Sequence, residues 1–218
     1  MRIALLSAVS LAAIATATAA NAGSAWPNWY LGLKGSVNMV EDSDVGGAQS
    51  GKLEYDNGFG VSAALGYHPD FAKSSVGKGR IEAEYLYQKN DFDGGTIGGV
   101  SSPFIGDQGT SALMLNALYD FTLQGSRWAP YIGAGIGYAQ TDVSGNLAGV
   151  TVDNDDNGFA WQLLAGLGYS PESIPYTTWT VGCRYFNAGD VKVNSSIGTD
   201  IELENTTHSL EAGVQLKF

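Results

Sequence analysis

The chain has 218 residues, enough for one domain of ordinary size, and it combines 30 glycines, 5 Trp, 11 Tyr and 8 Phe with only 15% charged residues. This composition disfavours a helix bundle, because glycine weakens helix interiors and aromatic side chains favour strands. The formal net charge of −11 argues against nucleic acid as a partner, since that binding depends on clustered Lys and Arg. A single cysteine, Cys183, excludes an internal disulfide framework.

Residues 1–22 have the pattern of a secretory signal peptide. Arg2 supplies a positive charge, residues 3–20 form an apolar stretch, and the Ala20–Ala22 triplet offers a cleavage site of small residues. The alternative is a retained transmembrane helix, because the stretch is near the shortest length that spans a bilayer. We expect cleavage, which leaves a mature domain of residues 23–218. That domain has no further stretch suited to a spanning helix, so it is either soluble or a membrane barrel.

Large apolar residues alternate with small or polar ones in eight segments of about ten residues, the length that a tilted membrane-spanning strand needs. The segments cover residues 29–38, 58–67, 79–89, 111–121, 131–141, 159–169, 178–188 and 207–218. The fifth segment places Gly133, Gly135 and Gly137 on one face, where they cannot build the apolar core of a soluble barrel. The pattern therefore predicts an all-β fold, an eight-stranded antiparallel up-and-down transmembrane β-barrel with its large apolar face toward lipid.

Aromatic residues gather near the ends of these segments, where a barrel meets the two membrane–water interfaces. We expect one girdle of Trp29, Tyr30, Tyr67, Tyr119, Phe121, Tyr131, Tyr169, Trp179 and Phe218. We expect the second girdle to contain Phe59, Tyr87, Tyr138, Phe159, Trp161 and Tyr185.

The connections between segments are of two kinds. Residues 68–78, 122–130 and 170–177 are short, whereas residues 39–57, 90–110, 142–158 and 189–206 are longer. The longer connections hold 16 of the 22 acidic residues, and their only basic residues are Lys52 and Lys192. Outer-membrane barrels have long outer loops and short periplasmic turns. We therefore expect one strongly acidic end, facing outward.

Four stretches give the chain a family resemblance: PYIGAGIGYA (130–139), GFAWQLLAGLGYS (158–170), VGCRYFNAG (181–189) and HSLEAGVQLKF (208–218). Together they resemble the opacity-type outer-membrane β-barrel family, which includes porin-like surface antigens and shares its architecture with the transmembrane domain of outer-membrane protein A. The resemblance implies an outer-membrane location in a Gram-negative bacterium and surface-exposed loops. It also implies that the terminal Phe218 is the signal that the barrel-assembly machinery reads. It implies no catalytic site.

The same alternation predicts a set of charged side chains inside the barrel. They are Lys34, Arg80, Glu82, Glu84, Asp120, Arg184 and Glu211. Isolated charges there would be costly, so we expect them to form ion pairs with one another. One interpretation is a structural plug in a lumen only wide enough for side chains. The other is a constriction of Glu82, Glu84 and Arg184 that selects ions.

These patterns leave three functional hypotheses. The first is a non-enzymatic surface protein that anchors the outer membrane and presents acidic loops to divalent cations, lipopolysaccharide or host molecules. The second is a narrow porin-like channel for small cations or solutes, with an acidic mouth that concentrates cations. The third is a lipid hydrolase using His208, Ser209 and Glu211, which strand geometry opposes because neighbouring residues point to opposite faces. We expect no cofactor, bound metal or catalytic residue.

Overall fold

The computed structural model describes residues 28–40, 44–45, 51–55, 58–97, 100–102, 105–147, 150–194 and 200–218. Side chains are described within these ranges for residues 28–39, 58–90, 108–142, 157–189 and 206–218. The predicted signal peptide and its cleavage site lie outside the described residues. No helix in the described part of the chain is long and apolar enough to cross a membrane.

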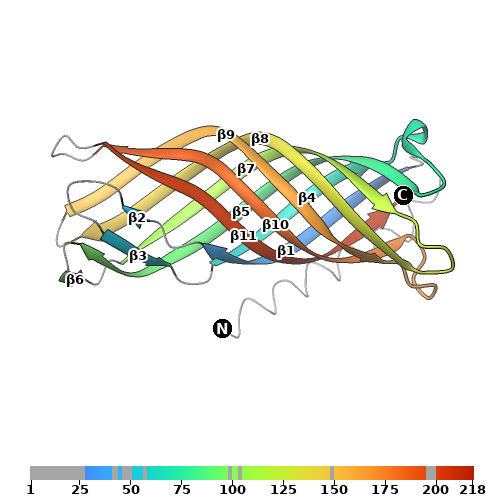
Figure 1. Cartoon of the computed structure of the whole chain (residues 1–218), viewed down its shortest axis with the longest axis horizontal. Coiled ribbons are helices and arrows are strands. Elements are labelled where there is room, and N and C mark those ends of the chain that lie inside the picture. The colour runs from blue at the N-terminus through green and yellow to red at the C-terminus, as the bar shows by residue number, and fades with distance from the viewer. Residues whose placement is uncertain are drawn as a thin grey trace.

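Eight long antiparallel strands close into a barrel, as the alternation predicted (Figure 1). They are β1 (Trp29–Val40), β4 (Gly58–Tyr67), β5 (Gly77–Ile97), β7 (Ile105–Phe121), β8 (Trp128–Leu147), β9 (Val150–Tyr169), β10 (Thr177–Asn194) and β11 (Asp200–Lys217). Each long strand pairs with the next long strand along the chain, and the ring closes where β1 pairs with β11, Tyr30 opposite Lys217. Every predicted segment lies on one of these strands, except that β11 ends one residue before the predicted Phe218, so the fold class is confirmed.

The alternating faces explain why this sequence forms a membrane barrel. Along β4, exposed and buried residues alternate without interruption from Gly58 to Gly66. The outward residues of the barrel are large and apolar: Val61, Leu113 and Ile136 are all more than half exposed. Such a continuous apolar surface is rare on soluble monomers and suits contact with lipid. Cys183 lies on this outer face, where it acts as a small apolar residue.

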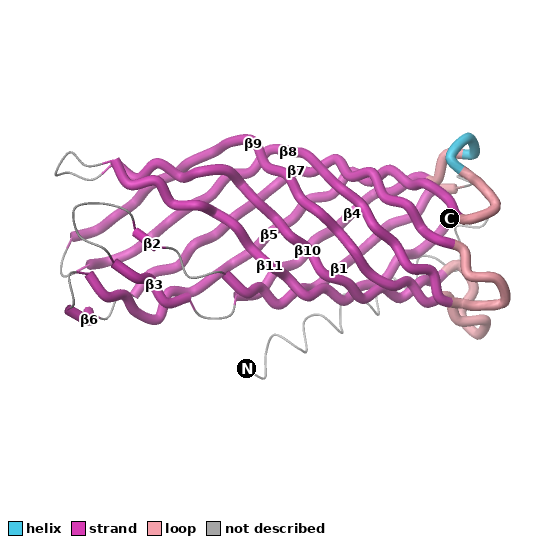
Figure 2. The backbone as a smooth tube through the Cα atoms, viewed as in Figure 1, coloured by secondary structure: helices cyan, strands magenta, loops and turns pink. Residues whose placement is uncertain are grey.

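The described turns all lie at one end of the barrel, together with the C-terminus (Figure 2). They connect β4 to β5, β7 to β8 and β9 to β10, and the first contains the short 3-10 helix η1 (Asp70–Ala72). In outer-membrane barrels the short turns and both termini face the periplasm. We therefore expect this end to be periplasmic, and we call it the periplasmic end. The opposite end is the outer end.

The longer connections are a partial correction to the sequence analysis, because much of their length is strand. Strand β5 has 21 residues, about twice what a tilted membrane span needs. The β8–β9 ladder runs to the pair Leu147 and Val150, and the β10–β11 ladder continues past a bulge at Gly189, where φ is +77°. Three short strands, β2 (Asp44–Val45), β3 (Gly51–Tyr55) and β6 (Val100–Ser102), extend the same end. The strands therefore continue well past the length that spans a bilayer, over stretches whose sequence has no hydrophobic alternation.

Outward aromatic side chains pair near both ends of the strands. At the periplasmic end, Trp128 packs against Tyr169 with ring centroids 4.7 Å apart. At the outer end, the Trp161 and Tyr185 rings are 5.2 Å apart. Tyr169, Trp161 and Tyr185 are predicted members of the two girdles, whereas Trp128 was not predicted. Two members of the predicted periplasmic girdle, Tyr30 and Tyr131, are instead buried inside the barrel.

Candidate functional site

The lumen is filled at mid-height by a charged cluster around Glu84. Its Oε1 accepts hydrogen bonds from Ser62 Oγ at 2.7 Å and from Arg184 Nη2 at 2.6 Å, and Lys34 Nζ lies 3.2 Å away. Its Oε2 accepts from Asn116 Nδ2 at 2.8 Å and Gln162 Nε2 at 3.1 Å. The carboxylate thus has five donors around it, which compensates for its complete burial.

Arg184 connects this carboxylate to the opposite wall. Its Nε donates to Glu211 Oε1 at 2.5 Å and its Nη1 donates to Gln162 Oε1 at 2.7 Å, while Nη2 bonds Glu84. The side chains of Arg184 and Glu84 are both 0% exposed. Lys34 Nζ lies 3.7 Å from Glu211 Oε2, which has no hydrogen bond of its own. We call these seven residues the Glu84 cluster: Lys34, Ser62, Glu84, Asn116, Gln162, Arg184 and Glu211.

The Glu84 cluster draws side chains from seven of the eight long strands, and the remaining strand contributes a glycine. Gly135 of β8 points into the lumen opposite Asn116, and a Cβ there would overlap the Asn116 carboxamide. The glycine face seen in the sequence therefore makes room for the amides of Asn116 and Gln162, which hydrogen-bond to each other at 2.6 Å. The result is a cross-section closed by bonded side chains.

A second charged level, nearer the periplasmic end, is organised around Arg80. Its Nη1 is 3.4 Å from Glu82 Oε1 and its Nε is 3.4 Å from Asp120 Oδ1. The guanidinium also lies over the Tyr131 ring, 4.9 Å from the centroid, and the Tyr30 hydroxyl donates to Glu82. Tyr30 and Tyr131 were predicted as interfacial aromatics, but each shares strand parity with the inward residues and serves as a luminal partner of this level.

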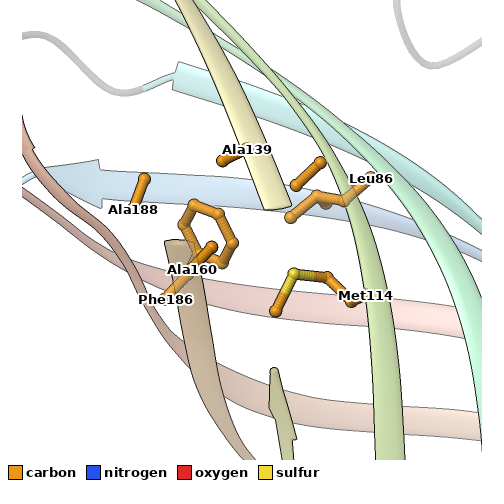
Figure 3. Packing of buried hydrophobic residues seen from close by; sticks show 7 residues of the cluster. Leu86, Met114, Ala139, Ala160, Phe186 and Ala188 are labelled. Carbon is orange, nitrogen blue, oxygen red and sulfur yellow. The ribbon is translucent and has the colours of Figure 1, made fainter. Parts of the chain in front are cut away.

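The third level, on the outer side of the Glu84 cluster, is apolar (Figure 3). Leu86, Met114 and Phe186 are almost fully buried and form its core. Ala112, Ala139, Ala160 and Ala188 complete it. This level was not predicted from the sequence, because large apolar residues were expected on the lipid face. The alternation of strand faces could have revealed this level. Leu86 and Phe186 lie two residues beyond Glu84 and Arg184, so they point to the same side of their strands, into the lumen.

The structure places all seven sequence-predicted charges inside the barrel, but in two separate groups. Lys34, Glu84, Arg184 and Glu211 belong to the Glu84 cluster, whereas Arg80, Glu82 and Asp120 form the level below. Glu82 therefore does not join Glu84 and Arg184 in a single constriction. Ser62, Asn116 and Gln162 were missed because uncharged residues in a strand pattern give no warning of a buried network.

The remaining candidate residues have simple surroundings. Ser209 Oγ points inward and donates to Asn38 Oδ1 at 2.8 Å, while His208 packs edge-on against Tyr185 on the outer face. These two side chains therefore form no dyad. Among the described residues no group of His, Cys, Asp or Glu is arranged to hold a metal ion. The backbone N–H of Phe218 donates to the Trp29 carbonyl at 3.1 Å, which ties the C-terminus to β1.

A protein-family model described as the outer membrane protein beta-barrel domain matches residues 5–218. The chain belongs to this family. Membership places it in the outer membrane, in agreement with the apolar barrel exterior.

Solved structures show the same fold. Neisserial surface protein A (NspA) aligns with a TM-score of 0.57 and 23% identity, covering 88% of this chain and 97% of NspA. OprG from Pseudomonas aeruginosa aligns with a TM-score of 0.53 and 16% identity over 88% and 96% of the two chains. AlkL, solved in lipid bilayers, gives 0.52 and 19% over 90% and 94%. A comparison with curated protein sequences gives no significant match.

Proposed function

We propose that this outer membrane barrel is a closed, non-enzymatic scaffold that anchors in the bilayer and presents its acidic outer segments at the cell surface. The observation that carries the proposal is the Glu84 cluster. Arg184 and Glu84 are completely buried and bonded across the lumen, and the apolar level of Leu86, Met114 and Phe186 lies directly outside them. Two packed levels in series leave the outer end, rather than the lumen, as the surface for interaction.

The chemistry of the outer end follows from its charge. The four longer connections, which lie at this end, hold 16 of the 22 acidic residues of the sequence. Their only basic residues are Lys52 and Lys192. Such a surface attracts cations and concentrates them. We therefore propose divalent cations, and through them the phosphate-rich lipopolysaccharide of the same leaflet, as its first partners, with host surface molecules as a further class. Assembly into the membrane would depend on the barrel-assembly machinery reading Phe218.

Two other functions have less support. A narrow cation channel would fit the acidic outer end, but it needs water to pass the Glu84 cluster and the apolar level. A lipid hydrolase would need a nucleophile activated by a neighbouring base. Ser209 bonds Asn38 inside the barrel, and His208 lies on the opposite face of β11.

Surface display can be tested by epitope insertion in cells. An epitope placed in the outer connection between β10 and β11, after Ser196, should be labelled by antibody on intact cells. The matched control is the same epitope after Gly125, in the periplasmic turn between β7 and β8, which should be labelled only after permeabilisation. Equal labelling of both on intact cells, or of neither, would contradict the proposal. Heat-modifiable migration on a detergent gel establishes that each variant is folded.

A further inference from the structure

A small cavity opens at the periplasmic end of the lumen, beneath the Arg80 level. Its volume is about 50 Å³, room for a few atoms. The walls come from the periplasmic ends of six strands, β5 and β7 to β11, and from the chain just beyond β4 and β9, and they include Lys78, Thr178, Gln215 and Lys217. Arg80 and Tyr131 lie at its inner end, directly below the packed part of the barrel. We call this space the periplasmic vestibule.

The charge of the vestibule is unbalanced. Three cationic side chains, Lys78, Arg80 and Lys217, line it together with a single carboxylate, Asp120. That carboxylate is already shared, because Arg80 Nε lies 3.4 Å from Oδ1 and His68 Nε2 lies 3.4 Å from Oδ2. Within the described part of the chain, neither Lys78 nor Lys217 has a carboxylate within ion-pair distance. Two ammonium groups thus line one small space without a counter-charge of their own.

The remaining lining supplies neutral donors. The hydroxyls of Ser170 and Thr178 lie 2.8 Å apart, and Thr180 and Gln215 complete a polar wall. Burial lowers the pKa of His68, so this ring is neutral at neutral pH and can donate its Nε2 proton to Asp120. A phosphate-sized oxyanion needs cations and hydroxyl or amide donors converging on one space, and the vestibule provides both.

We propose that the periplasmic vestibule binds a free, phosphate-sized oxyanion from the periplasm, held by Lys78 and Lys217 against the Arg80 guanidinium. The Glu84 cluster closes the route toward the outer end, so the anion enters and leaves on the periplasmic side. The site is a binding site and not a transport step. It stands on residues that the surface-display function does not use, so either proposal can fail without the other.

The test is titration of the refolded mature protein, in a zwitterionic detergent, with inorganic phosphate, followed by calorimetry and by backbone amide NMR shifts. Saturable binding is expected, with shifts at the periplasmic ends of β5 and β11. Lys78→Gln and Lys217→Gln should each weaken binding about tenfold, since each removes one charge-assisted contact. Thr180→Val keeps every charge and should weaken phosphate binding severalfold. This variant tests the site if a lysine variant folds poorly.

Lys89→Gln is the matched control. Lys89 lies on the same strand as Lys78, about 36 Å away along the strand at roughly 3.3 Å per residue, toward the outer end. Its replacement changes the net charge equally and should leave phosphate affinity unchanged. Absence of saturable binding to the wild-type protein would overturn the proposal. An equal loss of affinity in Lys89→Gln and Lys217→Gln would also overturn it, because it would show attraction to net charge alone.

Discussion

Two charged levels occupy the same lumen and differ in how completely their polar atoms are bonded. In the Glu84 cluster, both oxygens of the Glu84 carboxylate accept hydrogen bonds, with distances of 2.6 to 3.2 Å, and only Glu211 Oε2 lacks one. At the Arg80 level, two residues away on β5, the ion pairs are 3.4 Å long, and Glu82 Oε2 and Arg80 Nε make no hydrogen bond. The first level is a packed plug, and the second is the inner wall of a cavity. Glu84 and Glu82 are the same residue type, and they differ in the number of hydrogen-bond donors that reach the carboxylate. This number determines whether the buried charge belongs to a packed plug or to a cavity wall.

The largest effect is expected from Glu84→Gln. This change leaves Arg184 and Lys34 buried with one fewer counter-charge, and breaking a buried ion pair costs about 3–5 kcal/mol. Urea unfolding of the protein in detergent or lipid vesicles measures it. The control is Glu172→Gln, in an exposed turn pair with Arg127, which should change stability by less than about 1 kcal/mol. Equal stabilities of the two variants would show that the Glu84 cluster does not support the barrel.

Phe186→Ala tests the apolar level next to that plug. Removing a fully buried aromatic side chain from the cluster that includes Leu86 and Met114 should cost about 3 kcal/mol, because the barrel wall cannot collapse onto the cavity. The same unfolding experiment applies, with Phe159→Ala on the lipid-facing side of β9 as the control. An unchanged unfolding midpoint would mean that the side chain does not pack as the structure shows.

Glu82→Gln sharpens the comparison between the two levels. Glu82 has longer ion-pair contacts than Glu84, and one of its oxygens has no partner, so the loss should be only about 1 kcal/mol. The Tyr30 hydroxyl can still bond the substituted amide. The informative quantity is the difference between the Glu82→Gln and Glu84→Gln unfolding free energies. If Glu82→Gln proved the more destabilising, the assignment of plug and cavity wall would have to be reversed.

The smallest effect is a pH dependence from His68. Burial lowers its pKa in the folded barrel, so the unfolded chain binds the proton more readily. This stability is fully present above the unfolded value of about 6.5 and declines as the pH falls below it. Unfolding midpoints between pH 7.5 and 5.5 should therefore fall less in His68→Gln than in the wild-type protein. Identical pH profiles would show that His68 has no role in the decline.

The eight strands were predictable because lipid imposes alternation on every spanning segment. The inward charges were predictable for the same reason, since parity alone assigns Glu84 and Arg184 to the lumen. Their pairing was not, because the two residues are 100 positions apart and meet only through the barrel's register. The outer ends of strands such as β5 were taken for loops, because a ladder of backbone hydrogen bonds continues in water without a hydrophobic pattern.

The apolar level escaped prediction for a different reason. Leu86 and Phe186 have the residue types of the lipid face but the parity of the lumen, and residue type was given precedence. Tyr30 and Tyr131 were misplaced in the same way. The inward position of Tyr30 requires a glycine at residue 66, because a Cβ on Gly66 would overlap the Tyr30 ring. Such a space between distant strands is visible only after the barrel is closed.

Single-channel recording in planar bilayers tests the closed lumen most directly. The mature protein, refolded in detergent and checked by its heat-modifiable gel shift, should insert without steady conductance, because both packed levels block the passage of ions. Glu84→Gln should remain silent as long as it is folded, since the level of Leu86, Met114 and Phe186 stays intact. Reproducible conductance of the wild-type protein, with a size or ion selectivity that changes in Glu84→Gln, would contradict the account and make the Glu84 cluster a constriction.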